Sequence, residues 1–218
     1  MVMGSRTGAP KRDTYRHGDL RNALVEAGLE LARESGPDAV VLREATRRVG
    51  VVPNAAYRHF ADRRALLSAV AQAALALLAA ELEAAVVAAV PAGGDKGGPP
   101  AVARAAVRAL VAGYLGFAQA EPGLFRAAFA TSDMADTGNA SAAGPGGLTA
   151  FQLLGAALDG LVEAGALPPG RRAGAEYFVW SAVHGMAVLL VDGPLRGLSP
   201  AEAGQAGARL MESVERGL

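Results

Sequence analysis

Side chains that can bond both bases and phosphates gather in one short stretch of the chain. Asn54 carries a carboxamide, which can pair in a bidentate manner with N6 and N7 of an adenine. Arg43 precedes it and can reach either a phosphate or a guanine edge. Tyr57, Arg58 and His59 follow, although Arg58 could equally belong to a solvated surface. These residue types favour recognition of double-stranded DNA rather than the making or breaking of bonds.

The residues around this cluster predict the two short helices that must position it. Gly50 stands where a helix ends and φ turns positive, and Pro53 suits the first turn of a second helix. Ala56 and Phe60 can pack back onto the first helix. Such a helix-turn-helix places its second helix in the major groove of DNA. The inner face of the first helix consists of Leu42, Ala45, Thr46 and Val49.

The spelling of residues 41–67, VLREATRRVGVVPNAAYRHFADRRALL, resembles the DNA-binding domain of TetR-family transcriptional regulators. The earlier stretch YRHGDLR, residues 15–21, resembles the start of that family's first helix. The match covers roughly residues 14–70 and fills nearly every position of the motif. The competing interpretation is a solvated helical hairpin in an unrelated all-helical protein.

The resemblance implies roles for residues beyond Asn54 and Arg43. In the family pattern, Tyr57 and His59 position the phosphates, and Arg63 occupies the place of a basic phosphate contact. Tyr15 and His17 correspond to residues near the DNA backbone, and they could instead cap and pack the first helix.

The chain departs from the family pattern at the starts of both short helices. Relatives carry Ser or Thr at positions 41 and 52, where this chain has Val41 and Val52. A valine cannot accept the unpaired backbone N–H of a helix start, and loss of such a cap costs about 0.5–2 kcal/mol. We therefore expect both helices to fray more readily than in typical relatives. Thr46 replaces a preferred alanine, a small intrusion between the helices.

Composition predicts an all-α protein, because Ala, Leu, Glu and Arg dominate the periodic segments and strand signals are scarce. The absence of cysteine excludes disulfides and thiolate-based zinc sites. The amino-terminal segment lacks the apolar core of a secretory signal, and the apolar run 65–80 falls short of a membrane span. We expect a cytoplasmic protein with no membrane partner.

Charge and periodicity divide the chain into three parts. Residues 1–13 form a disordered basic arm, residues 14–61 the DNA-binding domain, and residues 62–218 a helical ligand-binding and dimerisation domain. The net charge of zero hides a surplus of +4 in residues 1–64 and −4 in the remainder. A basic end is what phosphate binding requires, although a solvated charged surface would give a similar surplus.

The second domain contains one histidine that could suggest a catalytic or metal-binding role, His184. The sequence offers no accompanying set of residues that would complete a catalytic or metal site around it. We therefore expect no enzyme activity, no metal and no cofactor. His184 is better suited as a polar anchor in an apolar cavity for a small-molecule effector. The same aromatic residues could simply fill the core. The residues expected around this cavity are Tyr114, Phe117, Phe125, Phe129, Phe151, Trp180, His184 and Met186.

Trp180, His184 and Gly185 repeat the W-xxx-HG spelling of a C-terminal domain found in one branch of TetR-like regulators. Family members dimerise through two helices near the C-terminus, which here would be 148–165 and 173–191. We expect a homodimeric repressor that leaves a palindromic operator when it binds a small apolar or amphipathic molecule. The alternatives are an effector-free DNA-binding dimer and a helical module whose helix-turn-helix is incidental.

Overall fold

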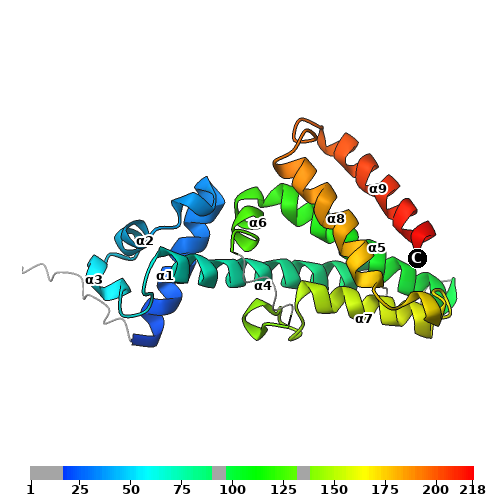
Figure 1. The fold of residues 1–218 in the computed structure, drawn as a ribbon, viewed down its shortest axis with the longest axis horizontal. Coiled ribbons are helices and arrows are strands. Elements are labelled where there is room, and N and C mark those ends of the chain that lie inside the picture. Colours follow the sequence, from blue (N-terminus) through cyan, green and yellow to red (C-terminus); the bar gives the residue numbers. More distant parts are fainter. Residues whose placement is uncertain (1–16, 90–96, 132–137) are drawn as a thin grey trace, which may run out of the picture.

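The protein is almost entirely helical in the computed structural model, which describes residues 17–89, 97–131 and 138–218 (Figure 1). These residues contain no β-strand, so the all-α prediction is confirmed. The basic arm 1–13 and Tyr15 lie outside the described residues. The helices are α1 (His17–Ser35), η1 (Pro37–Ala39), α2 (Leu42–Val49), α3 (Pro53–Ala56), α4 (Arg63–Ala89), α5 (Gly98–Ala120), α6 (Pro122–Ala128), η3 (Ala140–Ala142), α7 (Ala150–Glu163), η4 (Pro169–Arg171), α8 (Ala175–Val191) and α9 (Pro200–Gly217).

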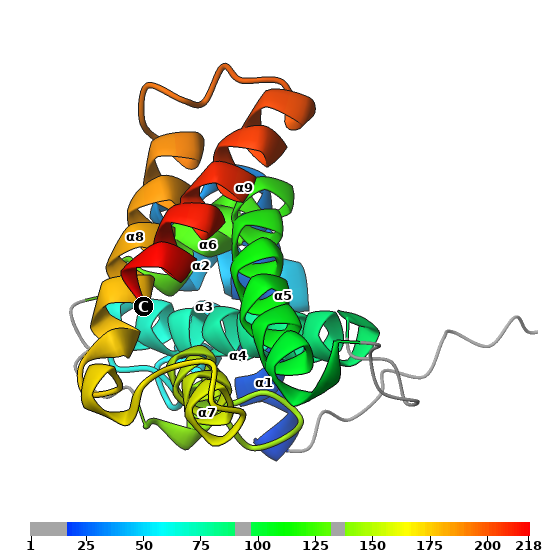
Figure 2. The same ribbon diagram turned by 90° about the vertical axis from the view of Figure 1, so that its right-hand side faces the viewer.

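Helix α4 is the longest element and belongs to both halves of the molecule (Figure 1). Its 27 residues span roughly 40 Å at about 1.5 Å per residue. It begins beside α1 to α3 and continues between the helices of the C-terminal half, where it packs against α5, α6 and α7. In Figure 2, α7 lies below α4, α5 passes in front of it, and α8 and α9 extend above it. Buried residues of both halves form one continuous apolar cluster, so α4 is a shared core element rather than a linker.

The helix-turn-helix forms as its sequence predicts. Gly50 ends α2 in the left-handed region with φ of 76°, and Val51 N–H donates to the carbonyl of Thr46 at 3.0 Å. Pro53 occupies the first turn of α3. Ala56 and Phe60 are buried against the rest of the unit, as expected for side chains that face the first helix.

The cap positions are also where the sequence places them. Val41 and Val52 are the N-cap residues of α2 and α3, both have extended backbones, and neither side chain makes a capping bond. Thr46 is fully buried, but its hydroxyl donates to the carbonyl of Arg43 at 2.9 Å. The intruding hydroxyl is therefore satisfied within its own helix.

A tight contact joins α6 to the end of α1. A side chain on Gly123 would begin 2.1 Å from the carbonyl oxygen of Ala32 and 2.8 Å from that of Arg33. Beside it, Arg33 Nε donates to Glu121 Oε2 at 2.9 Å. Only glycine allows backbones this close, so the start of α6 rests directly on the end of α1.

Two loop predictions need correction. The Gly, Ser, Ala and Asp residues of 131–147 predict a mobile or disordered segment. Residues 138–147 instead pack on α4: Ala142 is buried and Gly146 N–H donates to the Glu83 carboxylate. The Gly and Pro residues of 91–100 predict a loop over that whole stretch, but α5 already begins at Gly98. Proline suits a first helical turn, so it starts this helix instead of preventing it.

By length and composition alone, α4 and α5 could each cross a membrane, contrary to the expectation from the shorter run 65–80. Their apolar faces have another explanation in the fold. Leu66, Val70 and Leu78 of α4 and Val107 and Leu110 of α5 are buried in the shared core. Helices that form the core of a helical protein are often as long and as apolar as a membrane span. The buried apolar faces of α4 and α5 therefore account for their high hydropathy.

Restoring a cap at position 52 should stabilise the protein. The Val52 side chain is 69% exposed, so replacing it sacrifices little burial, and Thr could accept an unpaired N–H of α3. Val52→Thr should raise the free energy of unfolding by about 1 kcal/mol, measured by urea denaturation. Val87→Thr, at a similarly exposed site inside α4, is the matched control and should not stabilise. Equal effects of both substitutions would contradict the capping argument.

Candidate functional site

The outer surface of the helix-turn-helix collects the polar residues singled out in the sequence. Asn54, Tyr57 and Arg58 are exposed around α3, with Tyr57 56% exposed, and His59 is half-buried beside them. Arg43 is exposed at the start of α2. The fold therefore leaves hydrogen-bonding groups of two adjacent short helices free to meet a ligand, while Ala56 and Phe60 hold α3 from behind.

Ion pairs separate the arginines of this unit into two kinds. Arg48 pairs with Glu34 of α1, and Arg47 bonds Glu44 through its Nε at 3.0 Å. The hydrogen bonds to these arginines hold the pKa of both Glu34 and Glu44 below the usual range. The guanidinium groups of Arg43 and Arg58, in contrast, make no hydrogen bond or close ion pair with the described residues, although Arg43 lies near enough to Glu44 to help lower the pKa of that carboxyl.

Arg63 bonds the connection between α1 and α2. Its Nε donates to the carbonyl of Val40 at 3.0 Å, and its Nη2 donates to that of Pro37 at 2.9 Å and lies 3.3 Å from Asp38 Oδ1. The contact clamps η1 to the start of α4. A phosphate contact stays a prediction for Arg63, and it would use the Nη1 protons that these acceptors leave unused.

Two of the predicted DNA contacts cannot be placed. Tyr15 precedes the described residues, and His17 is the first residue of α1 but its side chain is not described. Their roles, in backbone contact or in helix capping, stay predictions.

Most of the predicted cavity residues form one aromatic cluster in the C-terminal half. Tyr114 of α5 meets Trp180 edge to face with 5.3 Å between ring centroids, and His184 lies 4.6 Å from the ring of Phe129. Phe125 contacts Phe129 at 5.0 Å. Phe151 completes the cluster from α7, 5.5 Å from the Trp180 ring. Helices far apart in sequence thus bring these rings together.

A hydrogen bond joins the two polar groups of the cluster. The Tyr114 hydroxyl lies 2.8 Å from Nδ1 of His184. Burial raises the pKa of the Tyr114 hydroxyl and lowers the pKa of the His184 imidazole, so both groups are neutral at physiological pH. Neutral Nδ1 can accept the tyrosine proton, and the imidazole then carries its proton on Nε2.

The space enclosed beside this pair is small. A cavity of about 20 Å³, room for about one water molecule, lies against Tyr114, Trp180 and His184. Phe117 is buried nearby without lining it, and Met186 lines a different groove, between α8 and α9. The aliphatic wall of this cavity was not predicted, because the apolar periodicity of a helix does not distinguish residues that line a cavity from residues that fill the core. That wall comprises Leu82, Leu110, Val111, Ala150, Leu154, Val179 and Val183.

Among residues 17–89, 97–131 and 138–218, no three His, Asp or Glu side chains lie close enough together to hold a metal ion. The arrangement at His184 offers a polar anchor in an apolar environment, and the arrangement at α3 offers hydrogen bonding to a polyanion.

Two family models match the chain. A model described as bacterial regulatory proteins of the tetR family matches residues 24–70, and a tetracyclin repressor-like C-terminal domain matches residues 107–214. The first contains the helix-turn-helix and the second contains the aromatic cluster. Neither match tests the narrower resemblance of Trp180, His184 and Gly185 to one branch of the family.

Curated relatives resemble the amino-terminal part alone. The class A tetracycline repressor protein of transposon 1721 from Escherichia coli is 44% identical over 55 residues, 25% of this chain and 26% of that protein. The class C tetracycline repressor protein from Escherichia coli is 39% identical over 57 residues, 26% of each chain. The alignments thus span about a quarter of these relatives.

Solved structures resemble the whole chain. A protein of unknown function from Rhodococcus sp. RHA1 is 28% identical with a TM-score of 0.70, covering 95% of this chain and 99% of that one. A proposed TetR-family transcriptional regulator from Mesorhizobium loti has a TM-score of 0.56 at 16% identity, covering 91% and 96%. The latter likeness is one of fold.

The stability of the C-terminal half should depend on the protonation of His184. Because folding lowers its pKa, the unfolded chain binds this proton more readily, and the free energy of unfolding should fall as pH drops below about 6.5. His184→Phe should lose part of this decline between pH 7.5 and pH 5.5, measured by urea denaturation at each pH. An identical pH dependence in both proteins would show that His184 does not contribute.

Proposed function

Because the chain belongs to the TetR family of DNA-binding transcriptional regulators, we propose that it is a homodimeric repressor that a small molecule releases from its operator. The observation that carries the proposal is the exposed face of the helix-turn-helix, where Asn54, Tyr57 and Arg58 stand free on a well-packed unit. We assign DNA binding to residues 14–61, and effector binding and pairing to residues 62–218. Cytoplasmic residence follows from a DNA partner.

The DNA contacts divide by chemistry. Asn54 reads a base edge, because its carboxamide can bond adenine in a bidentate manner at the exposed start of α3. The exposed Tyr57 and the half-buried His59 contact the DNA backbone, and Arg43, exposed at the start of α2, contacts either the backbone or a guanine edge. We add Arg58 to the predicted contacts, because it is exposed beside Tyr57 and unpaired among the described residues.

A second copy of the chain supplies a second α3 helix for the other half of the operator. The outward face of α8 carries an apolar stripe in which Tyr177 is 67% exposed, Val188 39% and Leu189 41%. Ser181 and Gly185 lie between them on the same exposed face and are small enough for close approach. Pairing through α7 and α8 would cover this stripe and double the DNA contact.

The effector site is the aromatic cluster around Tyr114 and His184. Its walls are apolar, and the hydroxyl–imidazole pair could orient a ligand that is apolar or amphipathic. A cavity of about 20 Å³ is too small for such a molecule, so binding must move outward one of the helices that line it, such as α7 or α8. That displacement gives the ligand a different affinity for two states, as release from DNA requires.

The small cavity also favours a second candidate function, an effector-free DNA-binding dimer whose C-terminal half only mediates pairing. Operator affinity measured across a panel of apolar and amphipathic metabolites separates the two. Release by one compound, weakened by Tyr114→Phe, supports the effector site. Constant affinity with every compound supports the alternative.

Removing the amide of Asn54 should weaken sequence-specific binding. A duplex selected by the purified protein from a random pool should be palindromic, and Asn54→Ala should bind it roughly 5- to 150-fold more weakly, with less discrimination at the contacted base. Fluorescence anisotropy at several salt concentrations is the measurement. Arg104→Ala, an exposed arginine on α5 far from the reading helices in sequence, is the control and should bind normally. Failure of the wild-type protein to prefer any duplex would sink the proposal.

A charge on the outward face of α8 should separate the subunits. Val188→Asp would bury an uncompensated carboxylate in the paired state, and sedimentation equilibrium should show a monomer where wild type is a dimer. Ala201→Asp, on the exposed start of α9, should leave pairing intact. If the Val188→Asp protein dimerises as well as wild type, the dimer must form through another face of the molecule.

A further inference from the structure

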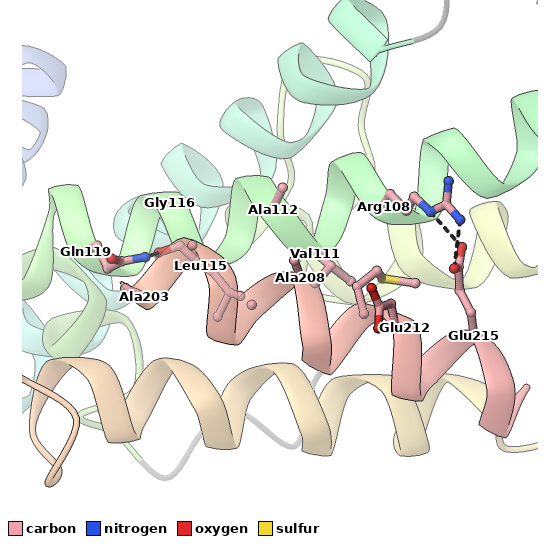
Figure 3. Close-up of a pocket in the computed structure, with 13 residues that line it drawn as sticks. Arg108, Val111, Ala112, Leu115, Gly116, Gln119, Ala203, Ala208, Glu212 and Glu215 are labelled. Carbon is pink, nitrogen blue, oxygen red and sulfur yellow. Dashed lines mark hydrogen bonds and ion pairs between the residues drawn. The ribbon is translucent and has the colours of Figure 1, made fainter. Parts of the chain in front are cut away.

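A groove separate from the aromatic cluster runs between α5 and α9 on the surface of the C-terminal half (Figure 3). Its volume is about 500 Å³, within the ~300–1,000 Å³ typical of small-molecule sites and far above the 20 Å³ beside His184. Figure 3 shows the two helices lying side by side, with Arg108 and Glu215 at one end and Gln119 and Ala203 at the other.

The groove exists because small residues line both of its walls. Ala112 and Gly116 of α5 face Gly204 and Ala208 of α9 across it. At its floor the helices nearly touch, since a side chain on Gly207 would begin 3.0 Å from a methyl group of Leu115. The Leu115 side chain therefore packs directly on the backbone of Gly207, and the small residues of the walls leave the space beside this contact open. Val111, Leu115 and Met211 make the floor apolar.

The polar groups of the groove lie at its ends, and most are hydrogen-bond acceptors. Glu212 is exposed at one end and has no cationic partner among the residues that the structure describes. Next to it, Arg108 is occupied by Glu215, with 2.7 Å between Nε and Oε1. Glu215 Oε1 is nevertheless buried without a properly directed hydrogen bond. The Arg108–Glu215 pair is neutral, so Glu212 gives this end a negative charge.

The opposite end of the groove is uncharged, and its polar group, Gln119, also offers a hydrogen-bond acceptor. The Gln119 amide nitrogen donates to the carbonyl of Leu115 at 3.0 Å, which leaves the amide oxygen available. From Arg108 to Gln119 the groove follows α5 for roughly 16 Å at about 1.5 Å per residue. A ligand that fits this groove must therefore be elongated and apolar along its length. It must also carry a cationic hydrogen-bond donor at the end that meets Glu212.

We propose that this groove binds an amphiphilic primary amine, with its ammonium group on Glu212 and its alkyl chain along Val111, Leu115 and Met211. A primary ammonium has three donors, and one of them would make a charge-assisted bond to the Glu212 carboxylate, while Arg108 keeps Glu215 as its own partner. The site does not depend on the proposed function, because it lies away from the DNA-binding face and has only Val111 in common with the lining of the cavity beside Tyr114 and His184.

Isothermal titration calorimetry of the full chain with dodecylamine, below its critical micelle concentration, tests the proposal. Wild-type protein should bind the amine, and Glu212→Gln should weaken binding about tenfold through loss of the charge. Ala208→Trp should abolish it, because the indole fills the middle of the groove from an exposed position that does not disturb the core. Glu81→Gln and Ala201→Trp, both at exposed sites outside the groove, are the matched controls and should bind as wild type.

Two further ligands test the chemistry. Dodecyltrimethylammonium, which has charge but no N–H donor, should bind more weakly than dodecylamine, and dodecyl sulfate should bind more weakly still. Equal binding of all three would overturn the proposal, because it would mean unspecific apolar adsorption. Loss of amine binding in Tyr114→Phe with retention in Ala208→Trp would also overturn it, since the amine would then occupy the internal cavity.

Discussion

The contact between the start of α6 and the end of α1 is the constraint on which the relation between the two halves depends. Gly123 lies so close to the carbonyls of Ala32 and Arg33 that no side chain fits, and the Arg33–Glu121 pair closes the same junction. Packed interiors shift between discrete arrangements rather than deforming continuously. A displacement of α6 must therefore move α1 or break this junction.

Helix α4 adds a second mechanical connection. It is continuous from Arg63, which clamps η1 in the DNA-binding half, to the residues that pack against α5 and α7. At the other end of α6, Arg126 pairs with Asp192 just beyond α8, with 2.7 Å between Nε and Oδ1. The aromatic cluster thus lies between helices that all contact either α1 or α4, directly or through α6.

Ion pairing decides which arginines of the helix-turn-helix remain free to contact DNA. Arg47 and Arg48 look equivalent to Arg43 and Arg58 in the sequence, and all four lie within the motif. Only the packing of α2 against α1 brings Arg48 to Glu34, and only the helical spacing of Arg47 and Glu44 joins that pair. These pairs leave the net charge of the amino-terminal part unchanged, but they reduce the number of arginines in the motif that are free to contact a phosphate.

The sequence alone determined the helices, the turn at Gly50, the uncapped valines and the membership of Phe60 in the core, because each depends on neighbours within a few positions. Local pattern could not reveal the order of residues 138–147, the engagement of Arg63, or the separation of Met186 from the aromatic cluster. Those depend on contacts such as Glu83 with Gly146, between residues distant in the chain. The tertiary structure also decided where space remains. A groove between α5 and α9 and a nearly filled cavity beside His184 both follow from side-chain volumes that meet across helices, and periodicity along one helix carries no information about the volume opposite it.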